Sequence, residues 1–232
     1  MKLDMNQQRM AIIIFARFNS KRLPNKVFKK IGFKPLLLHI IDRIKKKSKF
    51  QLPIIVATSN RKSDDKIENF CKKKNIKIYR GDLNNVYKRS LDCFSKFSLE
   101  SFVRVCADRP FFDVTLMDQM INKLKNSKFD IVSNQFPRTY PKGLGCEVAK
   151  TNIFFRIKKL KLTKEYKEHI FNYFYKNSKK YKIYNFSLSK KYSDLKNQDF
   201  SINNKNDLIK INNIYNKHKK KKYIDLLKIL ST

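Results

Sequence analysis

Several features that mark common protein classes are absent from this chain of 232 residues. No apolar run approaches the roughly 18 residues that a membrane-spanning helix needs, so no membrane span is expected. The first residues, MKLDMNQQRM, are polar and contain no signal-peptide core, which favours a cytoplasmic protein. The Walker A pattern GxxxxGK[ST] does not occur, so the chain lacks the phosphate-binding loop of P-loop proteins.

Cysteine occurs only four times, with no CxxC pair and no histidine close by in the sequence. This spacing argues against a disulfide framework and against a cysteine-based metal site. We expect all four to be buried thiols in a reducing compartment: Cys71, Cys93, Cys106 and Cys146.

Acidic residues are few: 19 Asp and Glu stand against 54 Lys and Arg, which gives a net charge of +35. Taken alone, this charge suggests nucleic-acid binding. The excess is mainly lysine, however, and it accompanies abundant Asn, Ile, Tyr and Phe, 4 Gly and no Trp, a composition that A/T-rich codons produce. We therefore expect no specific nucleic-acid partner, although the charge favours anionic ligands through long-range steering.

Short apolar runs alternate with segments of helical spacing along the first half of the chain. The runs predict strands, and the spaced segments predict helices. The strands are expected at residues 11–15, 53–58, 76–79, 102–106 and 130–133, and the helices at 36–46, from 63 onward, at 86–97 and at 113–124. Strands without polar alternation, separated by helices, indicate an α/β protein with a parallel sheet covered on both faces.

The pattern loosens after residue 134. A loop rich in Pro and Gly precedes a short strand at 147–149, an aromatic helix at 166–175, an edge strand at 182–186 and a helix at 207–215. The final KHKKKKYIDLLKIL predicts a basic segment before a short amphipathic helix. No repeat or linker divides the chain, so residues 1–232 are expected to form a single domain with an excursion at about 134–190.

Ligands of parallel sheets bind outside the carboxyl ends of the strands, so the loops at those ends are informative. The loop after the first strand reads FARFNSKRLPNK, in which Arg17 and Lys26 flank a turn at residues 23–25. Arg offers forked donors and Lys a point charge, and both suit phosphate oxygens. A solvated basic loop is the alternative interpretation, because lysine is common throughout this chain.

Asp108 directly follows the fourth expected strand, where a carboxylate can bind a Mg²⁺ ion that bridges phosphates. A capping role or a salt bridge with Arg109 is the alternative. In PRTYPKGLGCEV, residues 137–148, Arg138 and Tyr140 could bind an anionic, hydroxyl-rich substrate, or the segment could be a stiff lid with incidental charge. His169 could contact substrate or simply pack within its helix.

In chain order, these segments resemble one family, the cytidylyltransferases that activate acidic sugars. The nearest branch is named for spore-coat polysaccharide biosynthesis and is related to acylneuraminate and 3-deoxy-manno-octulosonate cytidylyltransferases. The resemblance covers roughly residues 10–216 in unbroken order. It is carried by ARFNSKRLPNKVFKKIGFKPL, IIVATSN, IYRGDLNNVYKR, RVCADRPFFD, SNQFPRTYPKGLGCEV, the Glu168-His169 pair and FSINNKNDLIKI.

The resemblance implies a Rossmann-like three-layer αβα sandwich of the nucleotide-diphospho-sugar transferase type. It also implies a reaction in which CTP and an acidic sugar give a CMP-sugar and pyrophosphate, with Mg²⁺ as cofactor and a homodimer as a possible assembly. By position, the catalytic residues would be Arg17, Lys26 and Asp108. The nucleotide would be bound by Arg17, Ser20, Arg22, Lys26, Thr58, Ser59, Arg80 and Asp82. The sugar would be bound by Arg138, Tyr140, Glu147 and His169, and the metal by Asp108 and Asn203.

Three positions depart from the family pattern. Ala107 replaces a glycine, Gly145 replaces an aspartate that could contact sugar, and Asn203 replaces the aspartate expected as second metal ligand. An amide oxygen can coordinate Mg²⁺ but brings no charge. Two further hypotheses therefore accompany the active enzyme: a catalytically weakened homologue that binds nucleotide or sugar, and a basic protein that binds nucleic acid.

Overall fold

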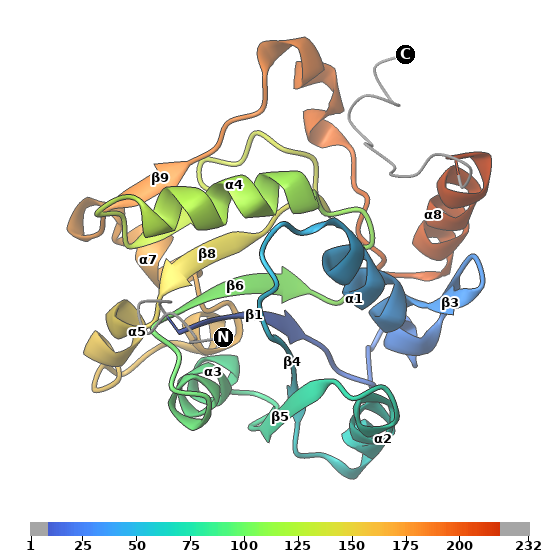
Figure 1. Cartoon of the computed structure of the whole chain (residues 1–232), viewed down its shortest axis with the longest axis horizontal. Coiled ribbons are helices and arrows are strands. Elements are labelled where there is room, and N and C mark those ends of the chain that lie inside the picture. The colour runs from blue at the N-terminus through green and yellow to red at the C-terminus, as the bar shows by residue number, and fades with distance from the viewer. Residues whose placement is uncertain (1–8, 219–232) are drawn as a thin grey trace, which may run out of the picture.

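The structure is a computed structural model that describes residues 9–218 (Figure 1). The polar start of the chain and the amphipathic helix expected near its end lie outside these residues. Within the described part, no helix is both long enough and apolar enough to cross a membrane. All four cysteines are unpaired; Cys106 is partly exposed and the other three are buried.

A seven-stranded sheet forms the centre of the molecule, in the order β5-β4-β1-β6-β8-β7-β9 (Figure 1). The strands are β1 (Met10–Phe15), β4 (Ile54–Ser59), β5 (Lys77–Gly81), β6 (Ser101–Cys106), β7 (Ile131–Ser133), β8 (Glu147–Lys150) and β9 (Ile183–Asn185). Every predicted strand is present, and β9 lies at the edge as expected.

The five strands expected in the first half of the chain, now β1, β4, β5, β6 and β7, all run in one direction, as predicted. The direction of β8 was not predicted: it runs antiparallel to both of its neighbours, β6 and β7, whereas the other pairings are parallel. The reason is the connection, because residues 134–146 join β7 to β8 without a helix, and parallel neighbours are usually joined by a crossover helix. The amino end of β8 therefore lies at the carboxyl edge of the other strands.

Helices cover both faces of the sheet. Alternate residues of β1 contribute to different cores, with Ile12 and Ile14 in one and Ala11 and Ile13 in the other. The first core also contains α1 (Leu36–Lys47), α2 (Asp65–Lys73) and α4 (Val114–Lys125); the second contains α3 (Val86–Lys96), α5 (Asn152–Arg156) and α7 (Asn172–Lys176). This is the predicted three-layer αβα sandwich. The Asp113 carboxylate caps α4 as expected, accepting from the Leu116 amide.

The aromatic helix expected at residues 166–175 is instead two short helices, α6 (Lys164–Glu168) and α7. Its backbone leaves helical geometry at His169, where φ is −109° and ψ is 81°. After the break, the consecutive residues Ile170 and Phe171 are both buried in the second core, each 2% exposed.

The remaining elements are short and lie around the sheet. A hairpin of β2 (Lys30–Ile31) and β3 (Lys34–Pro35) packs beside α8 (Lys205–His218), where Tyr215 contacts Gly32 (Figure 1). The single turns and 3₁₀ segments are η1 (Lys26–Phe28), η2 (Lys62–Asp64), η3 (Ser178–Lys180) and η4 (Lys190–Asn197).

His39 of α1 joins three parts of this fold. Its ring packs edge-on against Tyr215 of α8, at 5.4 Å, and against Phe111 of the loop after β6, at 6.4 Å. Its Nε2 is buried and has no hydrogen-bond partner among residues 9–218. Burial, with Arg43 and Lys34 adding to it, lowers the pKa of His39 from 6.5 to about 4.

This shift predicts a pH dependence of stability. Because the folded pKa lies below the unfolded value, the His39 contribution is complete above pH 6.5 and is lost as pH falls toward 4. His39→Phe keeps an aromatic ring but cannot titrate. Between pH 7 and 4, the free energy of unfolding in urea should fall by up to about 3 kcal/mol more in the wild type than in the variant. Parallel pH curves for the two proteins would contradict this assignment.

Candidate functional site

The buried carboxylate of Asp64 joins the carboxyl ends of β1 and β4. Its Oδ1 accepts from the Phe18 amide at 2.7 Å, and its Oδ2 accepts from Thr58 Oγ1 at 2.9 Å. The same Oδ2 accepts from both the amide and the hydroxyl of Ser59, at 3.0 and 2.5 Å. Thr58 and Ser59 are fully buried, so their hydroxyls position the first loop through Asp64.

Lys26 extends from that loop to the end of β6. Its Nζ lies 3.3 Å from Asp108 Oδ2 and donates to the Ile202 carbonyl at 2.9 Å. The Ile202 amide in turn donates to the Asp108 carbonyl at 2.9 Å. Three segments far apart in the sequence therefore meet at one point: the first loop, the β6 end and the strand-like segment before α8.

Asn203 belongs to the same cluster. Its Oδ1 accepts from Arg22 at 3.0 Å, and its Nδ2 donates to Ser201. The two acids that could compensate for its missing charge have other roles: Asp207 accepts from the amides of Asn203 and Asn204, and Asp199 accepts from Ser201. The cluster therefore includes three residues that the sequence analysis placed in the site: Lys26, Asp108 and Asn203.

The cluster can be compared with what Mg²⁺ requires. Within residues 9–218, no group of three or more His, Cys, Asp or Glu side chains could bind a metal by itself. Asp108 Oδ1 accepts no hydrogen bond from these residues, and its side chain is 28% exposed. One carboxylate, with ligand phosphates and water completing the shell, is a common Mg²⁺ arrangement in proteins. The residues present therefore fit one Mg²⁺ ion bound together with a phosphate ligand.

The first loop also carries a cation, Arg17, that is left without a partner by the described residues. Arg17 is exposed and forms no hydrogen bond or ion pair within residues 9–218. Ser20, partly exposed, donates its amide to the Phe18 carbonyl and so tightens the loop. The turn at Asn25 has a φ of 58° and leads directly into η1, which begins with Lys26.

The side chains of two residues predicted to bind the nucleotide, Arg80 and Asp82, make contacts away from the Lys26 cluster. Arg80 reaches α2, with NH1 2.7 Å from Asp65 and in contact with Glu68, while Nε donates to the Ser59 carbonyl. Asp82 accepts from the amides of Asn84 and Asn85, which lowers the pKa of its carboxyl. Neither side chain joins the Lys26 cluster, and their nucleotide contacts stay predictions.

Arg89 was missed by the sequence analysis. It is 5% exposed, donates from NH1 to the Asp82 carbonyl at 3.1 Å, and has an Nε without a partner. Burial, with nearby Arg17 adding to it, lowers the pKa of Arg89 to about 10. Its position in the V-x-x-R part of IYRGDLNNVYKR was the available signal.

Beside the end of β6, next to this cluster of side chains, lies a cavity with a volume of about 360 Å³. Three predicted sugar residues line it: Arg138, Glu147 and His169. Tyr140 does not, because it is 8% exposed and packs in the first core. The other lining residues were not predicted: Arg104, Arg109, Gln135, Phe171, Asn172 and Tyr175.

A buried ion pair forms the floor of this cavity. Arg104 and Glu147 face each other across β6 and β8, with NH1 2.9 Å from Oε1. Burial alone would lower the pKa of Arg104, but Cys106 and Glu147 raise it above its usual range. Tyr175 forms one wall, where its hydroxyl lies 2.8 Å from Ser133 Oγ and its ring stacks on Phe136.

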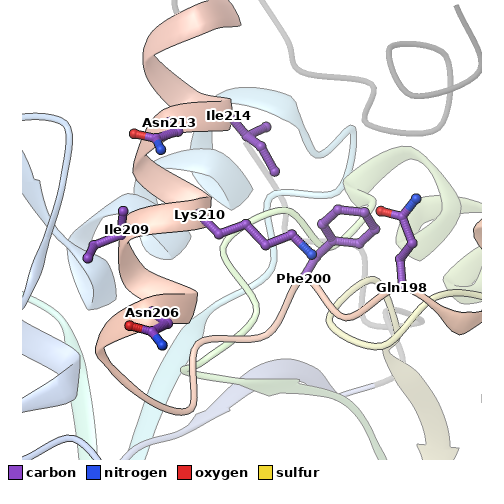
Figure 2. A pocket seen from close by; sticks show the side chains of 7 residues that line it. All are labelled: Gln198, Phe200, Asn206, Ile209, Lys210, Asn213 and Ile214. Atoms are coloured by element: carbon purple, nitrogen blue, oxygen red, sulfur yellow. The ribbon is translucent and has the colours of Figure 1, made fainter.

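Another hollow lies outside this site, between α8 and residues 198–200 (Figure 2). Lys210 extends across it, with Nζ 4.9 Å from the Phe200 ring centre and 3.0 Å from the Asp199 carbonyl (Figure 2). None of the predicted site residues lines it, and its open, mainly apolar wall brings no catalytic groups together.

Comparisons with known proteins identify the family of this chain. A family model described as "Cytidylyltransferase" matches residues 11–229. An uncharacterized protein, MJ1063, of Methanocaldococcus jannaschii is 32% identical over 74% of this chain and 69% of its own. The spore coat polysaccharide biosynthesis protein SpsF of Bacillus subtilis is 29% identical over 74% of this chain and 72% of its own.

Solved structures share the fold. A cytidylyltransferase from Leptospira borgpetersenii superposes with a TM-score of 0.80 at 25% identity, covering 91% of this chain and 95% of its own. A CMP:2-keto-3-deoxy-manno-octonic acid synthetase complexed with CTP gives 0.68 at 14% identity, covering 90% and 99%. The predicted nucleotide-diphospho-sugar transferase fold is confirmed.

Gly145 and Gln135 should be energetically coupled. A Cβ built at Gly145 would lie 1.8 Å from Gln135 Nε2, which donates to the backbone and side-chain oxygens of Asn134. Gly145→Ala should displace that amide and destabilise the fold by about 1–2 kcal/mol, because two hydrogen bonds are lost. In the Gln135→Ala background, the same substitution should cost much less. Equal costs in both backgrounds, measured by urea unfolding, would show that the two side chains are not coupled.

Proposed function

Because the chain belongs to the cytidylyltransferase family, we propose that it transfers the cytidylyl group of CTP to an acidic sugar, for surface polysaccharide biosynthesis. The products are a CMP-sugar and pyrophosphate. The observation that carries this proposal is the meeting of Lys26, Asp108 and Asn203 beside the exposed cations of the first loop. Two similar proteins support the choice of pathway and nucleotide. One is named for spore coat polysaccharide biosynthesis, and the structure of the other was solved with CTP.

In this reaction, a sugar hydroxyl attacks the α-phosphorus of CTP, loses its proton, and pyrophosphate leaves. Lys26 and Arg17 would bind the triphosphate together with Ser20 and Arg22, and would balance the charge of the leaving group. Asp108, with Asn203 beside it, would hold Mg²⁺, which neutralises phosphate charge when bound. Phosphoryl transfer depends mainly on positioning and charge neutralisation, and these residues supply both.

The sugar would occupy the cavity lined by Arg138, Glu147 and His169. This cavity uses side chains from residues 134–190, the excursion from an otherwise continuous single domain. The cavity lies close to Asp108, because two of its lining residues flank Asp108 in the sequence: Arg104 belongs to β6, and Arg109 directly follows Asp108 in the loop after β6. A homodimer and a cytoplasmic location stay predictions.

Pyrophosphate release tests the function. With CTP, Mg²⁺ and a panel of 2-keto-3-deoxy acid sugars, at least one sugar should support turnover. Lys26→Ala should lower kcat/KM by roughly 100-fold or more, because one donor to developing phosphate charge is lost. Lys29→Ala, an exposed lysine of the same loop, is the matched control. If no sugar supports turnover and CTP with Mg²⁺ gives no thermal stabilisation, the proposal fails.

A second candidate function rests on Asn203. Its amide brings no charge to the metal site, and its oxygen already accepts from Arg22. The chain would then be a weakened homologue that binds nucleotide or sugar with little turnover. Robust turnover by the wild type would exclude this candidate.

Asn203→Asp tests how the amide affects the metal. The added carboxylate should lower the Mg²⁺ concentration for half-maximal activity several-fold, because Mg²⁺ prefers anionic oxygen ligands. The Mg²⁺ dependence of CTP-induced thermal stabilisation should shift in the same direction. Asn204→Asp makes the same charge change one residue away, where a carboxylate can still accept from the Asp207 amide, and should shift neither curve. An unchanged Mg²⁺ requirement in Asn203→Asp would separate residue 203 from the metal.

A further inference from the structure

Glu147 has an oxygen that the protein leaves without a partner. The residue is 3% exposed, and Oε1 accepts from Arg104 at 2.9 Å. Oε2 is buried and has no hydrogen-bond partner within residues 9–218, although Glu147 lines the cavity. A buried carboxylate oxygen without a donor is costly, and native structures rarely leave one so. Glu147 thus brings to the cavity lining a carboxylate whose second oxygen is left unsatisfied by the described residues.

The charges around this oxygen restrict the ligand. Arg104 balances Glu147, so this pair is neutral as a unit. Arg109 donates from NH1 to the Gly145 carbonyl, which carries no charge, and Arg138 is exposed and has no partner within residues 9–218. The cavity thus has an excess of positive charge, which favours a ligand that carries a carboxylate.

The remaining walls suit a ring with hydroxyl groups. Phe171 and Tyr175 contribute aromatic rings to the lining, while Asn172 and Gln135 contribute amides. Gln135 occupies the space beside Gly145, since a Cβ built there would lie 1.8 Å from Gln135 Nε2. A volume of about 360 Å³ is adequate for one monosaccharide-sized ligand.

We propose that this cavity binds a sugar acid with its carboxylate at Arg109 and Arg138 and a neutral hydroxyl donating to Glu147 Oε2. Glu147 is then a specificity-determining residue, and Arg104 is a positioning residue that fixes its orientation. The donor is a hydroxyl rather than an ammonium, because Arg104 already balances the Glu147 charge and an ammonium would add an unpaired cation beside Arg109. This inference rests on the proposed function, and it narrows the class of sugar that receives the cytidylyl group.

Glu147→Gln is the first test. The amide has one oxygen, which cannot serve Arg104 and the ligand as fully as two oxygens do. The KM for the sugar acid should rise about tenfold or more, whereas the KM for CTP should change less than twofold. The matched control is Glu100→Gln, because Glu100 is an exposed acid just before the start of β6 whose ion-pair partner in the described part of the chain is Arg9. Equal rises in both KM values, or no rise in either, would overturn the proposal.

Substrate analogues give a second test that does not depend on the folding of a variant. The wild type should disfavour, by at least tenfold in kcat/KM, one analogue of the best sugar acid that lacks a single hydroxyl. Glu147→Gln, where it folds, should discriminate against that analogue much less. Equal use of every deoxy analogue, or preference for an amino group in place of that hydroxyl, would refute the assignment.

The two proposals fail in different ways. If CTP with Mg²⁺ stabilises the wild type but no sugar acid supports turnover, the proposed reaction fails. Thermal stabilisation by the same sugar acids, in the presence of CTP and Mg²⁺, then still measures the cavity. Stabilisation of the wild type that is weakened in Glu147→Gln would support the cavity assignment, and its absence in the wild type would remove it.

Discussion

The site depends first on one buried carboxylate, Asp64. It accepts four hydrogen bonds, from the Phe18 amide and from donors of Thr58 and Ser59, and is 1% exposed. Without Asp64, each of those buried donors would lose its hydrogen bond to water on folding and gain none in return, at a cost of about 1–3 kcal/mol. By fixing Phe18 to the end of β4, Asp64 sets where the cation-rich loop leaves the sheet. From that origin, Lys26 reaches Asp108.

Much of the fold follows from local sequence, because strands buried on both faces appear as unbroken apolar runs such as MAIIIF and IIVATS. One expected helix, at residues 166–175, is broken at His169, and the direction of β8 was not predicted. Both features involve contacts between elements: β8 pairs with β6 and β7, and Ile170 and Phe171 pack in the second core. The spacing of apolar residues within one segment does not reveal such contacts.

The candidate site divides in the same way. The order of motifs predicted Lys26, Asp108 and Asn203 as one group, and the structure brings their segments together. Thr58 and Arg80 have the chemistry of ligand-binding residues but bond to the scaffold, through Asp64 and through α2. Arg104 was missed because its function comes from pairing with Glu147 across two strands, 43 residues apart, and register between strands is a tertiary property.

The end of β6 explains how a chain with a charge of +35 can be selective. Exposed lysines such as Lys45, Lys72 and Lys88 lie on helix surfaces, where salt screens their charge over about 10 Å. At β6, by contrast, each charge has a fixed position: Asp108 points to Lys26, Arg104 to Glu147, and Arg109 to the Gly145 carbonyl. In the proposed function, one strand end thus separates a phosphate-binding side from a sugar-binding side. Reaction between two anionic substrates requires that separation, because each anion needs its own cations while the reacting atoms meet.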